Sequence, residues 1–119
     1  MSDTTTTTAT NAPAGAEPSP TKKMMGDFAP KLVSLTDDVL FADVWARPEL
    51  SPRDRSLVTI TALIAGGNAG QLPYHLNYGK ENGLTETEIV EAITHVAFYV
   101  GWPKAMSAID VAKDVFSAC

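Results

Sequence analysis

The sequence predicts an all-α protein. Apolar residues recur at spacings of three and four along several segments, as they do on one face of an α-helix. Capping residues, glycines and prolines separate these segments at helical lengths. No stretch alternates apolar and polar residues over the length of a strand. We therefore expect a compact bundle of about five to six helices.

Two short helices are expected first, over residues 27–35 and 37–46. Thr36 is suited to cap the second of them, because its hydroxyl can accept a hydrogen bond from a free backbone N–H. Arg47-Pro48 should end that helix, since the residue before a proline avoids the helical region.

The start of the next helix is strongly marked. Ser51 can cap it, Pro52 suits the first helical position, and Asp54 complements the positive end of the helix. Gly66-Gly67 should end it, because glycine readily adopts the left-handed conformation that closes many helices.

Three more helices should follow, over about 69–82, 86–100 and 103–116. Thr85 and Glu88 form a capping box at the start of the second. Gly101-Trp102-Pro103 should separate the second from the third.

The domain organisation is expected to be simple. Residues 1–22 include the threonine run Thr4–Thr8 and lack aromatic and long aliphatic side chains, which predicts a disordered tail. Residues 23–119 should form the helical domain. The apolar run of a secretory signal is missing, so we expect a cytoplasmic protein. A folded part of about 97 residues with wide apolar helix faces also favours a homo-oligomer.

Composition argues against several classes of partner. The net charge of −5, without a Lys/Arg cluster, argues against nucleic acid. No apolar stretch is long enough to cross a bilayer, so we expect no membrane partner. Cys119 is the only cysteine, which excludes an intramolecular disulfide and a cysteine-based structural metal site. The sequence has no metal-ligand spacing and no phosphate-binding loop.

Two histidines are candidates for acid–base chemistry near neutral pH. His75 falls on a predicted polar helix stripe, made of Asn68, Gln71, His75, Tyr78 and Asn82 at spacings of three, four and seven. The stripe either lines a site or is an ordinary solvated helix surface.

His95 has Glu91 four residues before it and Tyr99 four after. It is either an imidazole oriented by a carboxylate or a partly buried histidine with its hydrogen bonds satisfied. Arg55 either binds a substrate carboxylate or pairs with a carboxylate of the protein. Trp45 and Trp102 either wall a pocket or belong to the core or a subunit interface.

Two segments together resemble the carboxymuconolactone decarboxylase family over roughly residues 40–116. They are Leu50–Leu57 leading to Pro73-Tyr74-His75-Leu76, and Asn82–Ile89 leading to Ala97–Pro103 and Ala105–Ala108. The resemblance implies an alkylhydroperoxidase D-like helical bundle that assembles into trimers or hexamers.

The family contains a thiol peroxidase branch, from which this chain departs. In that branch a Cys-x-x-Cys pair precedes a histidine, and a glutamate on the preceding helix assists proton movement. The matching histidine is His75, whereas Asn68 and Gln71 stand at the cysteine positions and Ser56 at the glutamate position. Because an amide cannot form a thiolate or a disulfide, we expect no thiol peroxidase chemistry here.

Arg55-Ser56-Leu57, Tyr99–Pro103 and Ala105–Ala108 are more similar to the decarboxylase branch. That resemblance implies a cofactor-independent carboxy-lyase acting on a small carboxylated lactone or enone. The alternative is a non-catalytic member that binds a small molecule or serves in assembly. The expected catalytic residues are His75 and His95, and the expected substrate-binding residues are Arg55, Asn68, Gln71, Tyr99 and Trp102.

Overall fold

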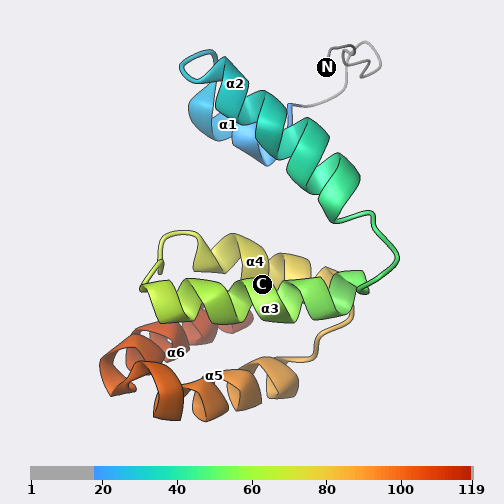
Figure 1. The fold of residues 1–119 in the computed structure, drawn as a ribbon. Coiled ribbons are helices and arrows are strands. Elements are labelled where there is room, and N and C mark those ends of the chain that lie inside the picture. Colours follow the sequence, from blue (N-terminus) through green and yellow to red (C-terminus); the bar gives the residue numbers. More distant parts are fainter. Residues whose placement is uncertain (1–17, 119) are drawn as a thin grey trace. The chain divides into compact units, whose positions relative to one another are not determined.

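The computed structural model describes residues 18–118, and every regular element in that part of the chain is a helix (Figure 1). The elements are α1 (Pro20–Met25), α2 (Pro30–Ser34), the π-helix η1 (Leu35–Val44), α3 (Pro52–Gly66), α4 (Leu72–Glu81), α5 (Glu86–Val100) and α6 (Trp102–Ser117). The all-α prediction is confirmed. The chain divides into two compact units between Val44 and Trp45.

The first unit contains α1, α2 and η1. Ser19 caps α1 by accepting a hydrogen bond from the Lys22 backbone N–H, and its own hydroxyl donates to Asp37 Oδ2 at 2.7 Å. None of the residues in these three helices is buried. Of the segment expected to be a tail, residues 1–17 lie outside the described residues, whereas α1 begins at Pro20.

The predicted break at Thr36 is wrong. Helix α2 runs directly into η1, and the Thr36 hydroxyl donates to the Leu32 carbonyl four residues earlier, at 2.7 Å. A threonine inside a helix can satisfy its hydroxyl in this way, so it need not act as a cap. The first helix of this pair also begins later than expected, because Pro30 takes the N-terminal position that suits proline.

The second unit is a bundle of α3, α4, α5 and α6 (Figure 1). Its core consists of aliphatic side chains from all four helices and from the turn after α4. They are Ile60, Ile64, Leu72, Leu76, Leu84, Ile89, Ile93, Val96, Ala97, Ala105, Ala108 and Ala112. The contribution of α6 is three alanines, whose small side chains let neighbouring helices approach closely.

Local signals set most helix ends in this bundle as predicted. Ser51 accepts from the Asp54 N–H at 3.1 Å, and Thr85 and Glu88 form the reciprocal capping box. Gly67 ends α3 in the left-handed conformation, with φ of 70°.

Helix α4 starts later than the predicted residue 69. The Gln71 N–H donates to the Asn68 carbonyl at 3.2 Å, so a turn precedes the helix and Leu72 is its first residue. Consequently Asn68 and Gln71 do not belong to the helix that carries His75.

The fully buried Leu76 provides a test of this core. Leu76→Ala should lower the free energy of unfolding by about 2–5 kcal/mol, because it leaves a cavity between packed helices. Leu50→Ala removes the same atoms from a side chain that is 38% exposed, and should cost less than about 1 kcal/mol. Urea unfolding followed by circular dichroism measures both. Equal losses would contradict the placement of Leu76.

Candidate functional site

His75 lies on α4 among three aromatic rings. Trp45 stacks on it with ring centroids 6.2 Å apart and an interplanar angle of 20°. Tyr74 meets it edge-on at 5.0 Å, and Tyr78 lies at 6.4 Å. Trp45 is itself only 9% exposed, so the imidazole is shielded from solvent on that side. This arrangement places a titratable ring in a largely apolar environment.

The Nδ1 atom of His75 is buried and has no hydrogen-bond partner among the described residues. Burial lowers the pKa of His75 below its ordinary value of 6.5, because the charged imidazolium loses its hydration. Buried polar atoms are nearly always hydrogen-bonded, so a nitrogen left without a partner can receive a ligand or exchange a proton with one. The site therefore presents a neutral imidazole whose buried nitrogen has no partner among the described residues.

The other members of the predicted polar stripe are distributed differently. Tyr78 lies on α4 beside His75, and Gln71 is exposed at the start of that helix. Asn82 follows the end of α4, and its Nδ2 donates to Oγ of the fully buried Ser56 at 2.9 Å. Asn82 thus ties α4 to α3 and is not a solvated surface residue.

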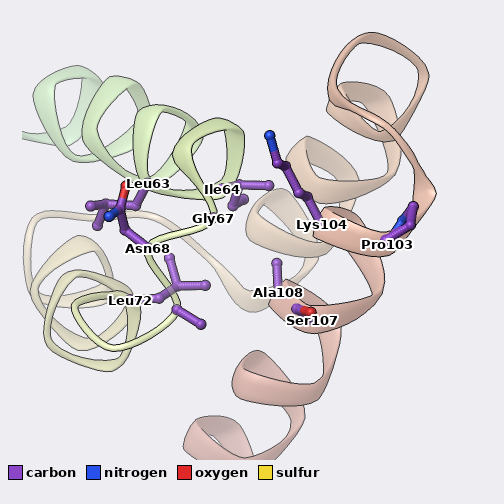
Figure 2. Close-up of a pocket in the computed structure, with 10 residues that line it drawn as sticks. Leu63, Ile64, Gly67, Asn68, Leu72, Pro103, Lys104, Ser107 and Ala108 are labelled. Carbon is purple, nitrogen blue, oxygen red and sulfur yellow. The ribbon is translucent and has the colours of Figure 1, made fainter.

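Asn68 lines a groove between α3, α4 and α6 whose volume is about 190 Å³ (Figure 2). We call it the α6 groove. Its lining includes Leu63, Ile64, Asn68, Leu72, Lys104 and Ala108. His75 is not among the residues that line it. The structure therefore separates two residues that the sequence analysis grouped together.

Arg55 binds backbone carbonyls of the loop that precedes α3. Its Nε donates to the Leu50 carbonyl and its Nη2 to the Arg47 carbonyl, each at 3.1 Å. Within residues 18–118 it forms no salt bridge with a carboxylate, whereas its neighbour Arg53 pairs with Asp54 and Glu88. The Nε and Nη2 atoms of Arg55 thus stabilise the loop that leads into α3.

His95, Tyr99 and Trp102 lie on the exposed side of α5 and at the start of α6. The rings of His95 and Tyr99 are 5.2 Å apart, and Phe98 meets Trp102 edge-on at 5.3 Å. Phe98 is 75% exposed, Tyr99 77% and Trp102 56%. Neither His95 nor Trp102 is a core residue. We call the surface formed by His95, Phe98, Tyr99 and Trp102 the aromatic face.

Three residues near these features escaped the sequence analysis. Tyr74 contacts His75, while Lys104 and Ser107 line the α6 groove. Lys104 carried a detectable signal, because it is the third residue of α6 and a cation is disfavoured at the positive end of a helix. Tyr74 and Ser107 carried none, since both occupy ordinary helical positions.

Two kinds of feature are absent between residues 18 and 118. No helix there combines the length and the apolar character needed to cross a bilayer. No group of three or more His, Cys, Asp or Glu side chains there is arranged to hold a metal ion.

The lowered pKa of His75 predicts a pH effect on stability. The folded state disfavours the imidazolium, so the unfolded chain binds the proton first as pH falls. The free energy of unfolding should therefore decrease as pH drops below about 6.5, until the lower folded pKa is reached. His75→Gln should lose this component of the pH dependence.

The pKa itself is measured by NMR titration of the imidazole in a His95→Gln variant, which leaves His75 as the only histidine. A midpoint at or above 6.5 would contradict the burial described here.

Comparison with known proteins identifies the family. Residues 30–114 match the carboxymuconolactone decarboxylase family. The chain is 36% identical over 92 residues to 4-carboxymuconolactone decarboxylase of Acinetobacter baylyi, covering 77% of this chain and 69% of that protein. It is 39% identical over 70 residues to nitrosuccinic acid decarboxylase of Metarhizium robertsii, covering 59% of this chain and 49% of that protein. These similarities support a decarboxylase function, and the chain belongs to the carboxymuconolactone decarboxylase family.

Proposed function

We propose that the protein is a cofactor-independent carboxy-lyase that decarboxylates a small carboxylated lactone or enone. The observation that carries this proposal is the buried, uncommitted Nδ1 of His75 among Trp45, Tyr74 and Tyr78. The two relatives support it, because both are named as decarboxylases of small acids. Within this proposal the protein is not a thiol peroxidase, since Asn68 and Gln71 cannot form a disulfide.

The proposed reaction requires a proton donor at carbon. When the substrate loses CO₂, the bonding electron pair moves into the unsaturated system and forms a dienolate, which must then be protonated. His75 is neutral at rest because burial lowers its pKa, but an anion bound beside it would favour the imidazolium. Substrate binding would thus load the proton that His75 later delivers to the dienolate carbon.

A cation should bind the substrate at a position away from the carboxylate that leaves as CO₂. We assign this role to Arg55 or His95, as catalytic or binding partners of His75. Arg55 keeps Nη1 without a partner among the described residues, although Nε and Nη2 bind backbone carbonyls. Gln71, Tyr99 and Trp102 complete the proposed substrate-binding set, with amide and aromatic groups that suit a small unsaturated acid, whereas Asn68 lines the α6 groove and is left out of this set.

His75→Gln should lower turnover by about 10²–10⁴-fold, because the amide keeps a hydrogen-bonding group but has no titratable proton. Release of CO₂ from 4-carboxymuconolactone and from nitrosuccinate, the acids named in the two relatives, is the assay. Asn77→Ala, an exposed change on the same helix, should retain turnover and serves as the control.

Full activity of His75→Gln on either acid would contradict the assignment. Binding of both acids without conversion would favour the non-catalytic alternative. Consumption of a hydroperoxide would contradict the exclusion of peroxidase chemistry.

We further propose that the protein assembles as a homo-oligomer, either a trimer or a hexamer, through surfaces that include the aromatic face. Exposed aromatic side chains at this density are characteristic of binding surfaces. In the first unit, Met24 and Phe28 are 75% and 93% exposed, and none of the helical residues of that unit is buried. Both units therefore leave apolar surface that association would cover.

Light scattering at micromolar concentration should give the mass of a trimer or a hexamer. Phe98→Asp places a charge on the aromatic face and should shift the population toward smaller species. Glu91→Ala changes an exposed polar residue on the same helix and should not. A monomeric wild-type protein would contradict the proposal.

A further inference from the structure

The α6 groove joins an apolar floor to a polar rim. Ile64, Leu72 and Ala108 are core residues, exposed by 3%, 1% and 2%, and their outer atoms form the floor. Figure 2 shows Leu72 and Ala108 on opposite sides of the groove. An apolar cavity of about 150 Å³ can hold benzene, so a groove of about 190 Å³ has room for a six-carbon body. Packed core side chains also keep the floor from collapsing.

The rim carries a positive charge that has no partner in the described part of the chain. Within residues 18–118, the Lys104 amine has no salt bridge or hydrogen bond. Its Cε lies 3.9 Å from where a Cβ on Gly67 would stand, so the side chain runs along the end of α3. The carbonyls of Leu63 and Ile64 at that end already accept the Asn68 and Gly67 N–H groups. Lys104 is therefore not needed to cap them.

The position of this cation is unfavourable without a ligand. The protein has 14 acidic and 9 basic residues, so acidic partners are plentiful, yet Lys104 has none in the described part of the chain. It stands in the first turn of α6, where the helix dipole repels a cation. An anion in the groove would relieve both effects. Asn68 and Ser107 supply further hydrogen-bonding groups at the rim.

We propose that the α6 groove binds a small monocarboxylic acid whose apolar body has about six to eight carbons. The carboxylate accepts a hydrogen bond from Lys104, and the body packs on Ile64, Leu72 and Ala108. The ligand is a free organic acid, because charge complementarity selects the carboxylate and the small volume limits the body. This site is separate from the imidazole of His75 and does not depend on turnover.

Benzoate is the probe, and benzyl alcohol is its neutral counterpart of similar shape. In ¹⁵N-resolved NMR titrations of the intact protein, benzoate should shift the backbone amides of Gly67, Asn68, Ala69 and Lys104, and should bind more tightly than benzyl alcohol. Lys104→Met keeps the apolar stem and removes the charge, and should weaken benzoate binding about three- to tenfold. Lys113→Met, an exposed change on the same helix outside the groove, should leave binding unchanged.

Several results would overturn the proposal. They are equal benzoate affinity in the wild-type and Lys104→Met proteins, equal affinity for benzyl alcohol, or no shifts in the groove at millimolar benzoate. Shifts centred on Tyr74 and His75 would place the acid at the proton-transfer site instead. As a second variant, Ala69→Phe fills the groove from an exposed loop position and should abolish binding while the melting temperature is retained. None of these measurements involves catalysis, so a failure of the proposed decarboxylation would be seen separately.

Discussion

The close packing of α4 against α3 is the constraint on which the rest of the bundle depends. Gly79 is buried at this contact, where an added Cβ would stand 3.0 Å from Leu84 Cδ1 and 3.2 Å from Ile60 Cδ1. A larger residue would have to displace these side chains. One turn earlier on the same helix lies His75, and the first residue of the helix, Leu72, reaches the α6 groove. The position of α4 therefore sets both features.

The hydrogen bond between Asn82 and Ser56 fixes the same contact just beyond the C-terminal end of α4. Ser56 is fully buried, and a buried hydroxyl without a partner is costly, so Asn82 satisfies a group that the packing encloses. In the peroxidase branch of the family, from which this chain departs, a glutamate stands at the position that matches Ser56. Here that position serves the packing of two helices. The groups of α4 whose pKa values are shifted are His75 and Tyr74.

His75 Nδ1 and the Lys104 amine both lack partners in the described residues, and they differ in physical character. His75 Nδ1 is buried among aromatic rings, where a charge is disfavoured and a neutral imidazole persists. The Lys104 amine is exposed, where its charge persists but lacks a counter-ion. The first environment suits proton exchange, and the second suits the capture of an anion. Under the two proposals above, the bundle would engage an organic acid at two separate places.

Local patterns in the amino-acid sequence were sufficient to predict the helical class, the family resemblance and most helix ends. Ser51, Thr85 and Gly67 act through hydrogen bonds and backbone angles that span only three to five residues, so their effect can be read locally. The same local reasoning failed at Thr36, because a hydroxyl that could cap a helix can equally bond within one. It also placed Asn68 on the helix of His75, whereas Asn68 belongs to a turn that precedes that helix.

The surroundings of the candidate site residues depend on contacts between distant parts of the chain. Trp45 lies 30 positions before His75 in the sequence and yet stacks on it, and no periodicity within α4 could reveal that burial. Arg55 could have faced a substrate, but its environment depends on carbonyls of a loop that folds back on α3. Lys104 meets α3 and α4 only because α6 packs beside them. Burial and charge pairing depend on residues distant in sequence, which is why the fold was predictable while the site was only partly so.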